Sequence, residues 1–573
     1  MMTDKIAEHE PWPARAALLA GVGALLGLAF DAAIRIGDFQ WSEDPLRVAL
    51  ASLIAVAGIL FAFTLERVRW LWSLLFAVGA GLIVALAFYW NGTPSGQSAG
   101  DEWRIFAALL AIASAAPIFQ SLRDEGRLKL GYTRVHAHAW TNVVLWFACW
   151  AFVLISYLLA LLLGELFHLI GIDLMRDTVR KPWFSTMLVG AALGAAAGLL
   201  RDRDKVLGLL QRVVTTVLSV LAPVLAVGLG LFVLALLLTG LAPLWEKTSA
   251  TTPILLAAVA GAFALVNAVV GNSPEEEARG QVLRWSAIAL AAVMTPLAIV
   301  AAISTWLRID QHGFTPERLW ALVFVLGVVA VALTYLWTLV RGRKAWADRL
   351  RPANIRLAIG ICAVALFLAM PFVNFGGIST RDQLARLESG RVKPEEFDWA
   401  ALKFDFGQPG RRALERIAAS GSPVLRRHAQ RAQLLTNRWA AREETRVGQN
   451  VRRLAGSIRV LPRQRPVPQP LLDVVARQSV CGDGGCTLFW SPGQRSAVAV
   501  GIPCPRCEAM ALQLMIDSKG EWQVLVTPGD VQRGTPASVE EQRAALARGA
   551  VEIRSVERRQ VFVGGKPVGT PFE

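Results

Sequence analysis

Long apolar runs separated by short polar segments fill the first two thirds of the chain. A helix that crosses a bilayer needs about 20 mostly apolar residues, so runs of this length predict membrane spans. We expect about eleven spans, at residues 14–34, 46–65, 70–90, 103–122, 143–170, 184–200, 213–241, 253–271, 285–306, 319–340 and 355–374. The run 184–200 gives the weakest signal, because it is short and rich in Ala and Gly. The predicted fold is an all-α polytopic membrane helix bundle that continues into a C-terminal periplasmic α+β tail.

The pattern changes abruptly after Asn374, where charged residues become frequent and shorter helical periods replace the apolar runs. We expect a helix from Thr380, a candidate N-cap, to Gly390, a candidate stop. A Pro-rich segment at 462–470 indicates a stiff linker. Beyond the linker, the apolar pattern predicts short strands at 496–502, 509–516, 522–527 and 551–563.

Composition agrees with this division of the chain. Of 573 residues, 54% are hydrophobic, which places the chain in the membrane class. The predicted domains are a transmembrane helix bundle at 1–375, a basic helical subdomain at 376–461, the Pro-rich linker at 462–470, and a small Cys-containing β-rich module at 471–573.

The distribution of positive charge predicts how the bundle lies in the membrane. With the N-terminus inside, the inner segments and the span ends beside them carry 20 Lys and Arg residues, and the opposite loops and the span ends beside those carry 9. Cytoplasmic loops are the ones enriched in Lys and Arg, so we expect a cytoplasmic N-terminus. An odd number of spans then places the chain after Asn374 outside, which in a bacterial inner membrane is the periplasm. No small-residue cleavage site follows the first run, so we expect it to remain as a span rather than act as a signal peptide.

The formal net charge of +15 narrows the choice of partners. From Phe375 onward the chain carries 30 Lys and Arg against 20 Asp and Glu, so most of the excess lies in the tail. Basic domains often bind nucleic acid, but a periplasmic tail would meet little of it. Besides the lipid bilayer, we expect anionic headgroups or an acidic envelope component as partners, and no nucleic acid. The simpler alternative is a solvated Arg-rich helix over 411–465.

Ionisable residues at the ends of the predicted spans are candidate functional residues, because a charge near hydrocarbon needs a partner or water. The polar loop Thr305–Arg318 is the densest such group, and the topology places it on the same outer side as residues from two other spans. The candidate polar cluster consists of Asp31, Glu165, His168, Arg308, Asp310, His312 and Arg318. Glu165 and His168 share a helical face and could relay a proton, bind a cation or hold a substrate group. The alternative is that all seven are interfacial charges that pair locally.

Two polar features lie apart from this cluster. Asn267 falls inside the eighth predicted span, where an interhelical hydrogen bond is its simplest role. His136 and His138 fall in a predicted cytoplasmic loop, and on a helix they would point to different faces. A metal site there would need a strand and further ligands. No phosphate loop, dinucleotide fingerprint or nucleophile elbow is present, and we expect no cofactor.

Four cysteines of the tail form the pattern Cys481-x4-Cys486 and Cys504-x2-Cys507. In a reducing compartment this pattern would suggest a zinc ribbon, because four thiolates on two tight turns can close a tetrahedron. Outside the inner membrane, structural disulfides are the stronger expectation, although spacing alone allows three pairings. A redox-active Cys504–Cys507 pair is a third alternative. It is disfavoured because a reactive pair should open a helix, whereas this one lies between predicted strands.

The loop Trp306-x-Arg308-Ile309-x-x-x-Gly313-Phe314-Thr315-x-x-Arg318 resembles the bacterial multispanning family known as domain of unknown function 4153. The resemblance covers most of the membrane region and continues at Ile378–Gly390 and Phe397–Gly407. It implies a bacterial inner-membrane protein without an assigned activity, and it carries no residue roles over to this chain. This chain has Trp306 and His312 where the family resemblance would suggest tyrosines, and the Cys-containing module is an addition to the common pattern.

Three functions fit these features. The one we favour is a non-enzymatic envelope sensor or scaffold with a periplasmic binding tail. The second is a proton-coupled secondary transporter or permease that uses Glu165, His168 and the 305–318 loop. The third is a membrane enzyme that acts on lipid or glycan at the outer face, with His312 or Asp310 as the base. Convergence of Glu165, His168 and the loop on a water-accessible cavity would favour the second or third.

Overall fold

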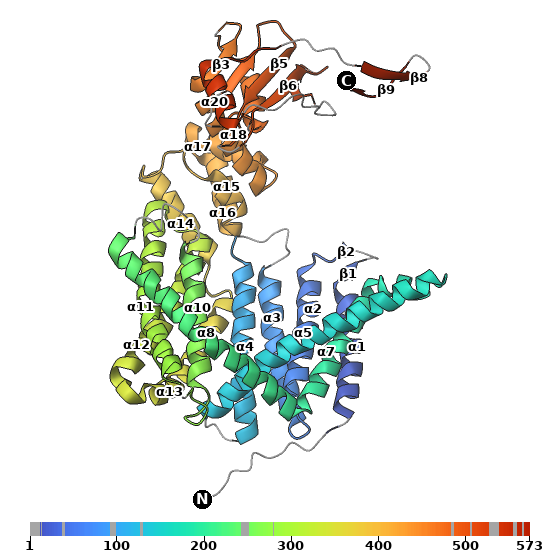
Figure 1. Ribbon diagram of the computed structural model, residues 1–573, viewed down its shortest axis with the longest axis vertical. Coiled ribbons are helices and arrows are strands. Elements are labelled where there is room, and N and C mark those ends of the chain that lie inside the picture. The colour runs from blue at the N-terminus through green and yellow to red at the C-terminus, as the bar shows by residue number, and fades with distance from the viewer. Residues whose placement is uncertain are drawn as a thin grey trace, which may run out of the picture. The chain divides into compact units, whose positions relative to one another are not determined.

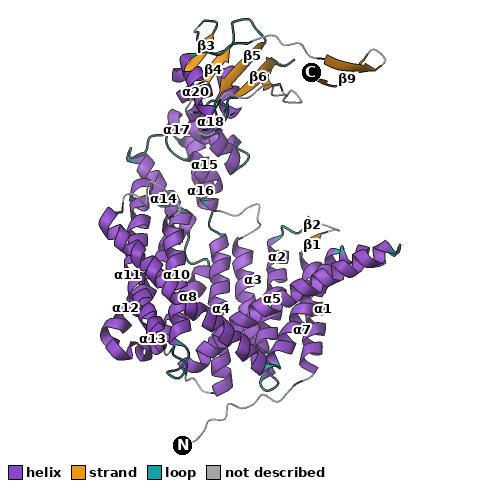
Figure 2. Ribbon diagram, in the orientation of Figure 1, coloured by secondary structure: helices purple, strands orange, loops and turns teal. Residues whose placement is uncertain are grey.

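The apolar runs form long helices, and the sheet structure lies mainly in the tail (Figures 1 and 2). The structure, a computed structural model, describes residues 12, 14–36, 40–91, 99–126, 130–241, 251–278, 280–463, 465–478, 480–482, 486–504, 507–518, 520–525, 538–553, 559–563 and 566–572. The chain folds into two units, residues 1–430 and 431–573.

Within the described residues, ten helical stretches are long and apolar enough to cross a membrane. They lie in α1 (Ala14–Ile34), α2 (Pro45–Thr64), α3 (Trp70–Asn91), α4 (Glu102–Glu125), α5 (Tyr132–Leu169), α7 (Pro182–Arg201), α8 (Asp204–Thr239), α10 (Thr251–Val270), α11 (Gln281–His312) and the stretch Pro316–Ala369. The last stretch comprises two helices, α12 (Pro316–Gly342) and α13 (Trp346–Ala369). The predicted multispanning helical fold is confirmed, and the exact number of spans stays a prediction.

The packing of α7 against α1 explains why a short run rich in Ala and Gly forms one of these helices. Gly190 and Gly194 are four residues apart on α7, as Gly23 and Gly27 are on α1. A methyl group on Gly190 would collide with the backbone of Gly23, and one on Gly194 with the carbonyl group of Leu19. Small residues at this spacing let two helix backbones approach closely inside a membrane. The composition that weakened the prediction at 184–200 is therefore what lets α7 pack.

Separate clusters of buried apolar side chains fill the first unit. One lies among α8, α10, α11, α12 and α13, and Leu290, Met294 and Leu297 of α11 are fully buried in it. Another lies among α1, α2, α5 and α7, around Leu145 and Cys149. A third includes side chains of α3, α4, α12 and α13, so it joins the earlier helices to the later ones.

Three short helices and the start of a fourth follow α13 in the first unit: α14 (Phe375–Glu388), α15 (Trp399–Phe404), α16 (Gly407–Ser420) and α17 (Pro423–Leu434). The prediction that Thr380 caps the first of them is wrong. Asn374 is the N-cap, because its side chain accepts a hydrogen bond from the N–H of Gly377 at 2.8 Å. Thr380 lies inside the helix, and Gly390, with a φ of 73°, follows its end as expected.

The second unit contains a five-stranded sheet in the order β3-β4-β5-β6-β7. Its strands are β3 (Ile458–Leu461), β4 (Cys486–Phe489), β5 (Ser496–Gly501), β6 (Met510–Ile516) and β7 (Trp522–Val524). β3 and β4 run parallel, and the other pairs are antiparallel. The sheet's core is shared with α18 (Arg438–Ser457) and α19 (Gln469–Gln478). The unit also contains α20 (Val539–Arg548) and the separate pair β8 (Arg559–Val563) and β9 (Lys566–Phe572).

Two strands of this sheet were not expected from the sequence. β3 follows α18 directly and has four residues, and β4 also has four, which is too few to show an alternating period. β3 lies before the Pro-rich segment 462–470 but pairs with β4 beyond it, and the end of that segment begins α19. Residues 526–527 and 554–558 of the predicted strands lie outside the described residues.

Candidate functional site

A short turn joins α11 to α12 within the loop Thr305–Arg318. Gly313 follows the end of α11 with a φ of 75°, a left-handed conformation that favours glycine, and its N–H donates to the carbonyl of Ile309 at 2.7 Å. The hydroxyl of Thr315 accepts a hydrogen bond from the N–H of Arg318 at 3.3 Å, and Pro316 takes the first helical position of α12. The sequence here thus encodes the end of one helix and the start of the next.

Three side chains of α14 hold this turn, and we call them the α14 clamp: Asp382, Gln383 and Arg386. They make five hydrogen bonds to backbone atoms of the turn. Asp382 accepts from the N–H of Phe314 at 2.7 Å, Gln383 donates to the carbonyls of His312 at 2.8 Å and Phe314 at 3.1 Å, and Arg386 donates to the carbonyls of Asp310 at 3.2 Å and Gln311 at 2.6 Å. The clamp joins the first helix after the bundle to the ends of two apolar helices.

Every backbone carbonyl from Asp310 to Phe314 accepts a hydrogen bond from a side chain. Arg318 completes the set, because it donates to the carbonyls of Gly313 at 2.9 Å and His312 at 3.2 Å. The last carbonyls of a helix lack partners within the helix, and cationic donors near them are favourable. The turn is therefore held through its backbone, and the side chain at position 312 takes no part in these bonds.

The loop residues of the candidate polar cluster take different roles in this arrangement. Asp310 and His312 contribute backbone carbonyls, and their side chains are exposed. Arg318 bonds to the turn, and both Arg308 and Arg386 are among its charged neighbours. These residues gather at one place, but they build a structural joint between helices.

Glu165 and His168 lie elsewhere, at the end of α5, which Figure 1 shows on the opposite side of the unit from α11 and α12. Glu165 forms ion pairs with Arg176 at 3.1 Å and Arg180 at 3.6 Å. The Nε2 atom of His168 lies 2.8 Å from a guanidinium nitrogen of Arg176 and must accept, because arginine only donates. Nδ1 therefore carries the proton and donates to Asp173 at 2.5 Å. The partners of both side chains come from α6 (Leu174–Val179) and the residues beside it.

Asp31 forms a third, separate group near the end of α1. Its carboxylate is buried and pairs with Arg35, four residues later. Arg47 in turn donates to the backbone carbonyl of Arg35 at 3.1 Å. The structure thus brings together the loop residues 308–318 of the candidate cluster, and places Asp31 and the Glu165–His168 pair apart from them.

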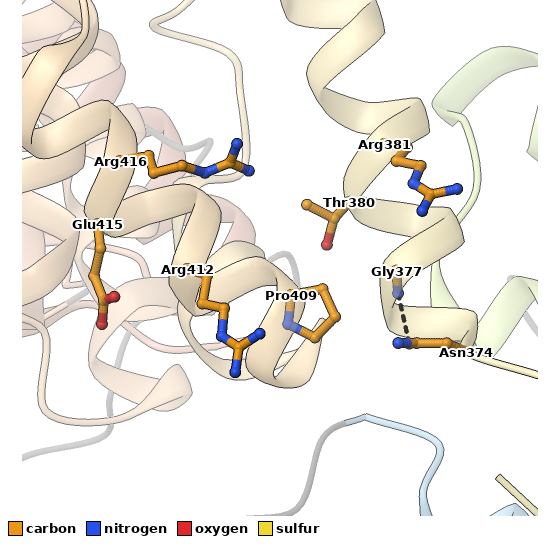
Figure 3. Close-up of a pocket in the computed structure, with 8 residues that line it drawn as sticks. All are labelled: Asn374, Gly377, Thr380, Arg381, Pro409, Arg412, Glu415 and Arg416. Carbon is orange, nitrogen blue, oxygen red and sulfur yellow. Dashed lines mark hydrogen bonds between the residues drawn. The ribbon is translucent and has the colours of Figure 1, made fainter.

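The residues that the sequence analysis missed are those of α14 and α16. Asp382, Gln383 and Arg386 have the spacing of one helical face, but nothing local shows that this face meets a turn some 70 residues earlier. Arg381 of α14, with Arg412 and Arg416 of α16, lines a hollow of about 490 Å³ between these two helices (Figure 3). The spacing of Arg412 and Arg416 on one face was the available signal.

The four tail cysteines form disulfides in the second unit, Cys481 with Cys486 and Cys504 with Cys507. The described residues contain no group of three or more His, Cys, Asp or Glu side chains that could hold a metal ion. Cys149 and Cys362 are free thiols on α5 and α13.

The family described as "Domain of unknown function (DUF4153)" matches residues 50–417, which include the α11–α12 turn, the α14 clamp and the hollow beside it. No curated protein and no solved structure matches the chain.

Proposed function

The chain belongs to the domain of unknown function 4153 family, and we propose that this member is a non-enzymatic sensor or scaffold of the bacterial envelope. In this proposal the helix bundle anchors the protein in the inner membrane. The second unit, with its disulfides and mixed sheet, presents a binding surface in the periplasm. Its partner would be an acidic envelope component, matching the basic tail.

The observation that carries the proposal is the α14 clamp. Five hydrogen bonds to one turn fix α14 to the ends of α11 and α12. Any force that moves α14 must either break these bonds or shift the two apolar helices with it. A clamp of this kind suits a protein that holds an extramembrane segment in register with its bundle.

The placement of the other candidate residues also favours this function over transport or catalysis. Glu165 and His168 pair with residues of their own short turn, at a distance from the 305–318 loop. Asp310 and His312 serve the turn through their backbone carbonyls. The polar groups that a transporter or an enzyme would have to combine are thus used in separate local contacts.

We further propose that the N-terminus is cytoplasmic and that the chain after α13 is periplasmic. The uneven distribution of Lys and Arg, 20 against 9, supports this orientation. Arg15 and Arg201 both pair with Glu66, so the segments that carry them share one end of the bundle and must lie on the same side of the membrane in either orientation. Fusing a reporter enzyme that is active only outside the cytoplasm after Glu573 tests the proposal. An active fusion is expected, and an inactive one on an inserted protein would reverse the orientation.

Photocrosslinking in intact cells tests the sensor or scaffold function. A photoreactive residue is placed at Arg477 or Arg495, two exposed positions of the second unit, and at the exposed Leu237 of α8 as a control. We expect a discrete protein or glycan adduct from the first two positions and only lipid adducts from Leu237. Two results together would overturn this proposal in favour of transport: no adduct from the second unit of the full-length protein, and uptake of a solute by proteoliposomes that contain it.

A further inference from the structure

The hollow between α14 and α16 has a strongly basic lining (Figure 3). Its volume of about 490 Å³ lies within the range of roughly 300–1,000 Å³ usual for ligand pockets. Arg381 lines it from α14, and Arg412 and Arg416 line it from successive turns of α16. Glu415 is the one acidic residue in the lining.

The positive charge of this hollow is largely uncompensated. Arg412 donates to the side-chain oxygen of Gln408 at 3.0 Å, a neutral partner that leaves its charge in place. Within the part of the chain that the structure describes, no carboxylate forms an ion pair with Arg381, Arg412 or Arg416. In Figure 3, Arg416 extends toward α14, whereas Glu415 lies on the side of α16 away from it. Arg381 extends from α14 away from α16, so the two guanidinium groups that α16 contributes, those of Arg412 and Arg416, are the ones that favour an anion as the occupant.

Two helix N-termini add to the positive potential. A second hollow of about 290 Å³ adjoins the first, since Asn374 and Pro409 line both. The first residues of α14 and of α16 line it together with Arg411, and Asp101, a charged neighbour of Arg104, is the acidic residue of its lining. Backbone N–H groups at the start of a helix carry partial positive charge. Phe406, the N-cap of α16, provides no side-chain acceptor for them.

The position of the hollows identifies the class of anion. The second hollow is also lined by Trp90 and Asn91 at the end of α3, Arg104 near the start of α4, and Trp320 in the first turns of α12. Trp90 is 45% exposed, whereas Trp320 is buried at 3%, so Trp90 is the tryptophan of this lining that can reach lipid. Tryptophans at the ends of apolar helices lie at the level of the lipid headgroups. The basic hollow therefore lies where phosphate groups of lipids are concentrated.

We propose that the hollow between α14 and α16 binds the phosphate of an anionic phospholipid headgroup through Arg412 and Arg416. Each guanidinium can donate two hydrogen bonds to phosphate oxygens in a planar fork. The inference rests on the proposed function in one respect, that this end of the bundle meets a membrane surface. It does not depend on which partner the second unit binds. A bound lipid would fasten α16 to the membrane beside the clamped α14.

Lipid titration of the full-length protein in detergent, followed by native mass spectrometry, tests the site. The probes are phosphatidylglycerol, which is anionic, and phosphatidylcholine, which is zwitterionic. The double variant Arg412→Gln/Arg416→Gln removes two charges from the hollow. The control Arg426→Gln/Arg427→Gln removes two charges from exposed positions of α17, outside the hollow.

We expect the wild type to prefer phosphatidylglycerol, and the variant in the hollow to bind it at least about tenfold more weakly. The control variant should bind within about twofold of the wild type. Equal losses in both variants would show diffuse surface charge and overturn the site. Equal affinity for both lipids, competition by inorganic phosphate at the same concentration, or tighter binding of an acidic glycan would overturn the lipid assignment.

Two further measurements separate this inference from the proposed function. The melting temperature and size-exclusion profile of each variant are compared with the wild type, because exposed arginines should be replaceable without unfolding. The Arg477 and Arg495 crosslinks are then repeated in the variant of the hollow. Lost lipid binding with retained crosslinks supports the site on its own. Retained lipid binding with lost crosslinks would overturn the site and leave the second unit's partner as a separate result.

Discussion

The carboxylate of Asp382 accepts a hydrogen bond from the backbone N–H of Phe314 at 2.7 Å, across 68 residues of sequence. Phe314 lies between Gly313, the C-cap of α11, and Thr315, the N-cap of α12. A residue between two caps belongs to neither helix, so its N–H needs an acceptor from another part of the chain. Asp382 supplies that acceptor and fixes α14 to the turn.

Replacing Asp382 with Ala should loosen the turn. Loss of a hydrogen bond to a charged acceptor costs about 1.5–3 kcal/mol, so local opening should become at least about tenfold more frequent. Hydrogen–deuterium exchange of the peptide that contains Phe314 measures this change. Asp382→Asn keeps an acceptor oxygen and should show a smaller effect. Arg381→Ala, at the neighbouring exposed position outside the clamp, is the control, and equal exchange in Asp382→Ala and Arg381→Ala would contradict the clamp.

Gly313 and Gly390 form a matched pair for testing the close approach of α14. Their φ angles are 75° and 73°, so both lie in the region that favours glycine and an added side chain is strained at each. A Cβ atom at Gly313 would lie 2.5 Å from side-chain atoms of Asp382 and Gln383, whereas none lies within 4 Å at Gly390. Gly313→Ala should therefore destabilise the protein by about 1–3 kcal/mol more than Gly390→Ala. Thermal unfolding in detergent measures the difference, and equal melting temperatures would count against the clamp geometry.

The sequence was sufficient for the features that a local pattern encodes. Apolar runs of spanning length predicted the long helices, and the glycine after α14 predicted where that helix stops. Asn374 was missed as a cap because Thr380, six residues later, carries an equally good capping side chain. Only the packed structure shows which of two suitable residues begins the helix.

The sequence was insufficient for features that depend on distant partners. The family motif around Gly313 and the motif that contains Asp382 were recognised separately, and nothing in either shows that they bind each other. Glu165 was grouped with the loop because both fall on the predicted outer side. A shared side of the membrane does not imply contact, and the ion pair of Glu165 with Arg176 is local.

The contact between α1 and α7 should be sensitive to a single added methyl group. A Cβ atom at Gly194 of α7 would overlap the carbonyl of Leu19 on α1. A Cβ atom at Gly21, a glycine of α1, would have no atom of another residue within 4 Å. Gly194→Ala should cost about 1–3 kcal/mol, because two backbones would have to separate. Gly21→Ala should be neutral or slightly stabilising. Melting temperatures of the two variants in the same detergent measure the contrast, and a neutral Gly194→Ala would show that the helices do not pack this closely.

The start of α20 should depend on pH. Ser538 and Glu541 form a capping box, in which the backbone N–H of Ser538 donates to the Glu541 carboxylate at 2.8 Å and the Ser538 hydroxyl accepts from the N–H of Glu541 at 3.3 Å. The hydrogen bonds from Ser538, chiefly that of its backbone, lower the pKa of Glu541 below its usual value of 4.5. The ionised carboxylate therefore stabilises the helix above pH 4.5, and this contribution is lost as the pH falls through the lowered pKa.

Hydrogen–deuterium exchange of the α20 peptide, corrected for intrinsic rates, tests the capping box. Protection should fall between pH 5 and pH 3 in the wild type, and Glu541→Gln should remove most of this pH dependence. Ser538→Ala should lower protection about fivefold at pH 7, the equivalent of ~1 kcal/mol for a lost cap. Protection that does not change with pH in the wild type would contradict the role of Glu541.

The predicted interhelical hydrogen bond of Asn267 is part of a closed ring that joins α10, α12 and α13. The side-chain nitrogen of Asn267 donates to the Tyr335 hydroxyl at 2.7 Å, this hydroxyl donates to Asn354 at 3.1 Å, and Asn354 donates back to Asn267 at 2.7 Å. Tyr335 is fully buried, so each group in the ring depends on the other two.

Tyr335→Phe should therefore cost about 1–2 kcal/mol of stability, and Asn354→Leu a similar amount. In the double variant the costs should fall short of additive by at least ~0.5 kcal/mol, because either change alone already breaks the ring. Unfolding of the two single variants and the double variant in detergent measures this coupling. Thr334→Val, at a partly buried position beside Tyr335, controls for loss of a hydroxyl outside the ring. Strictly additive costs would mean that the three side chains act independently.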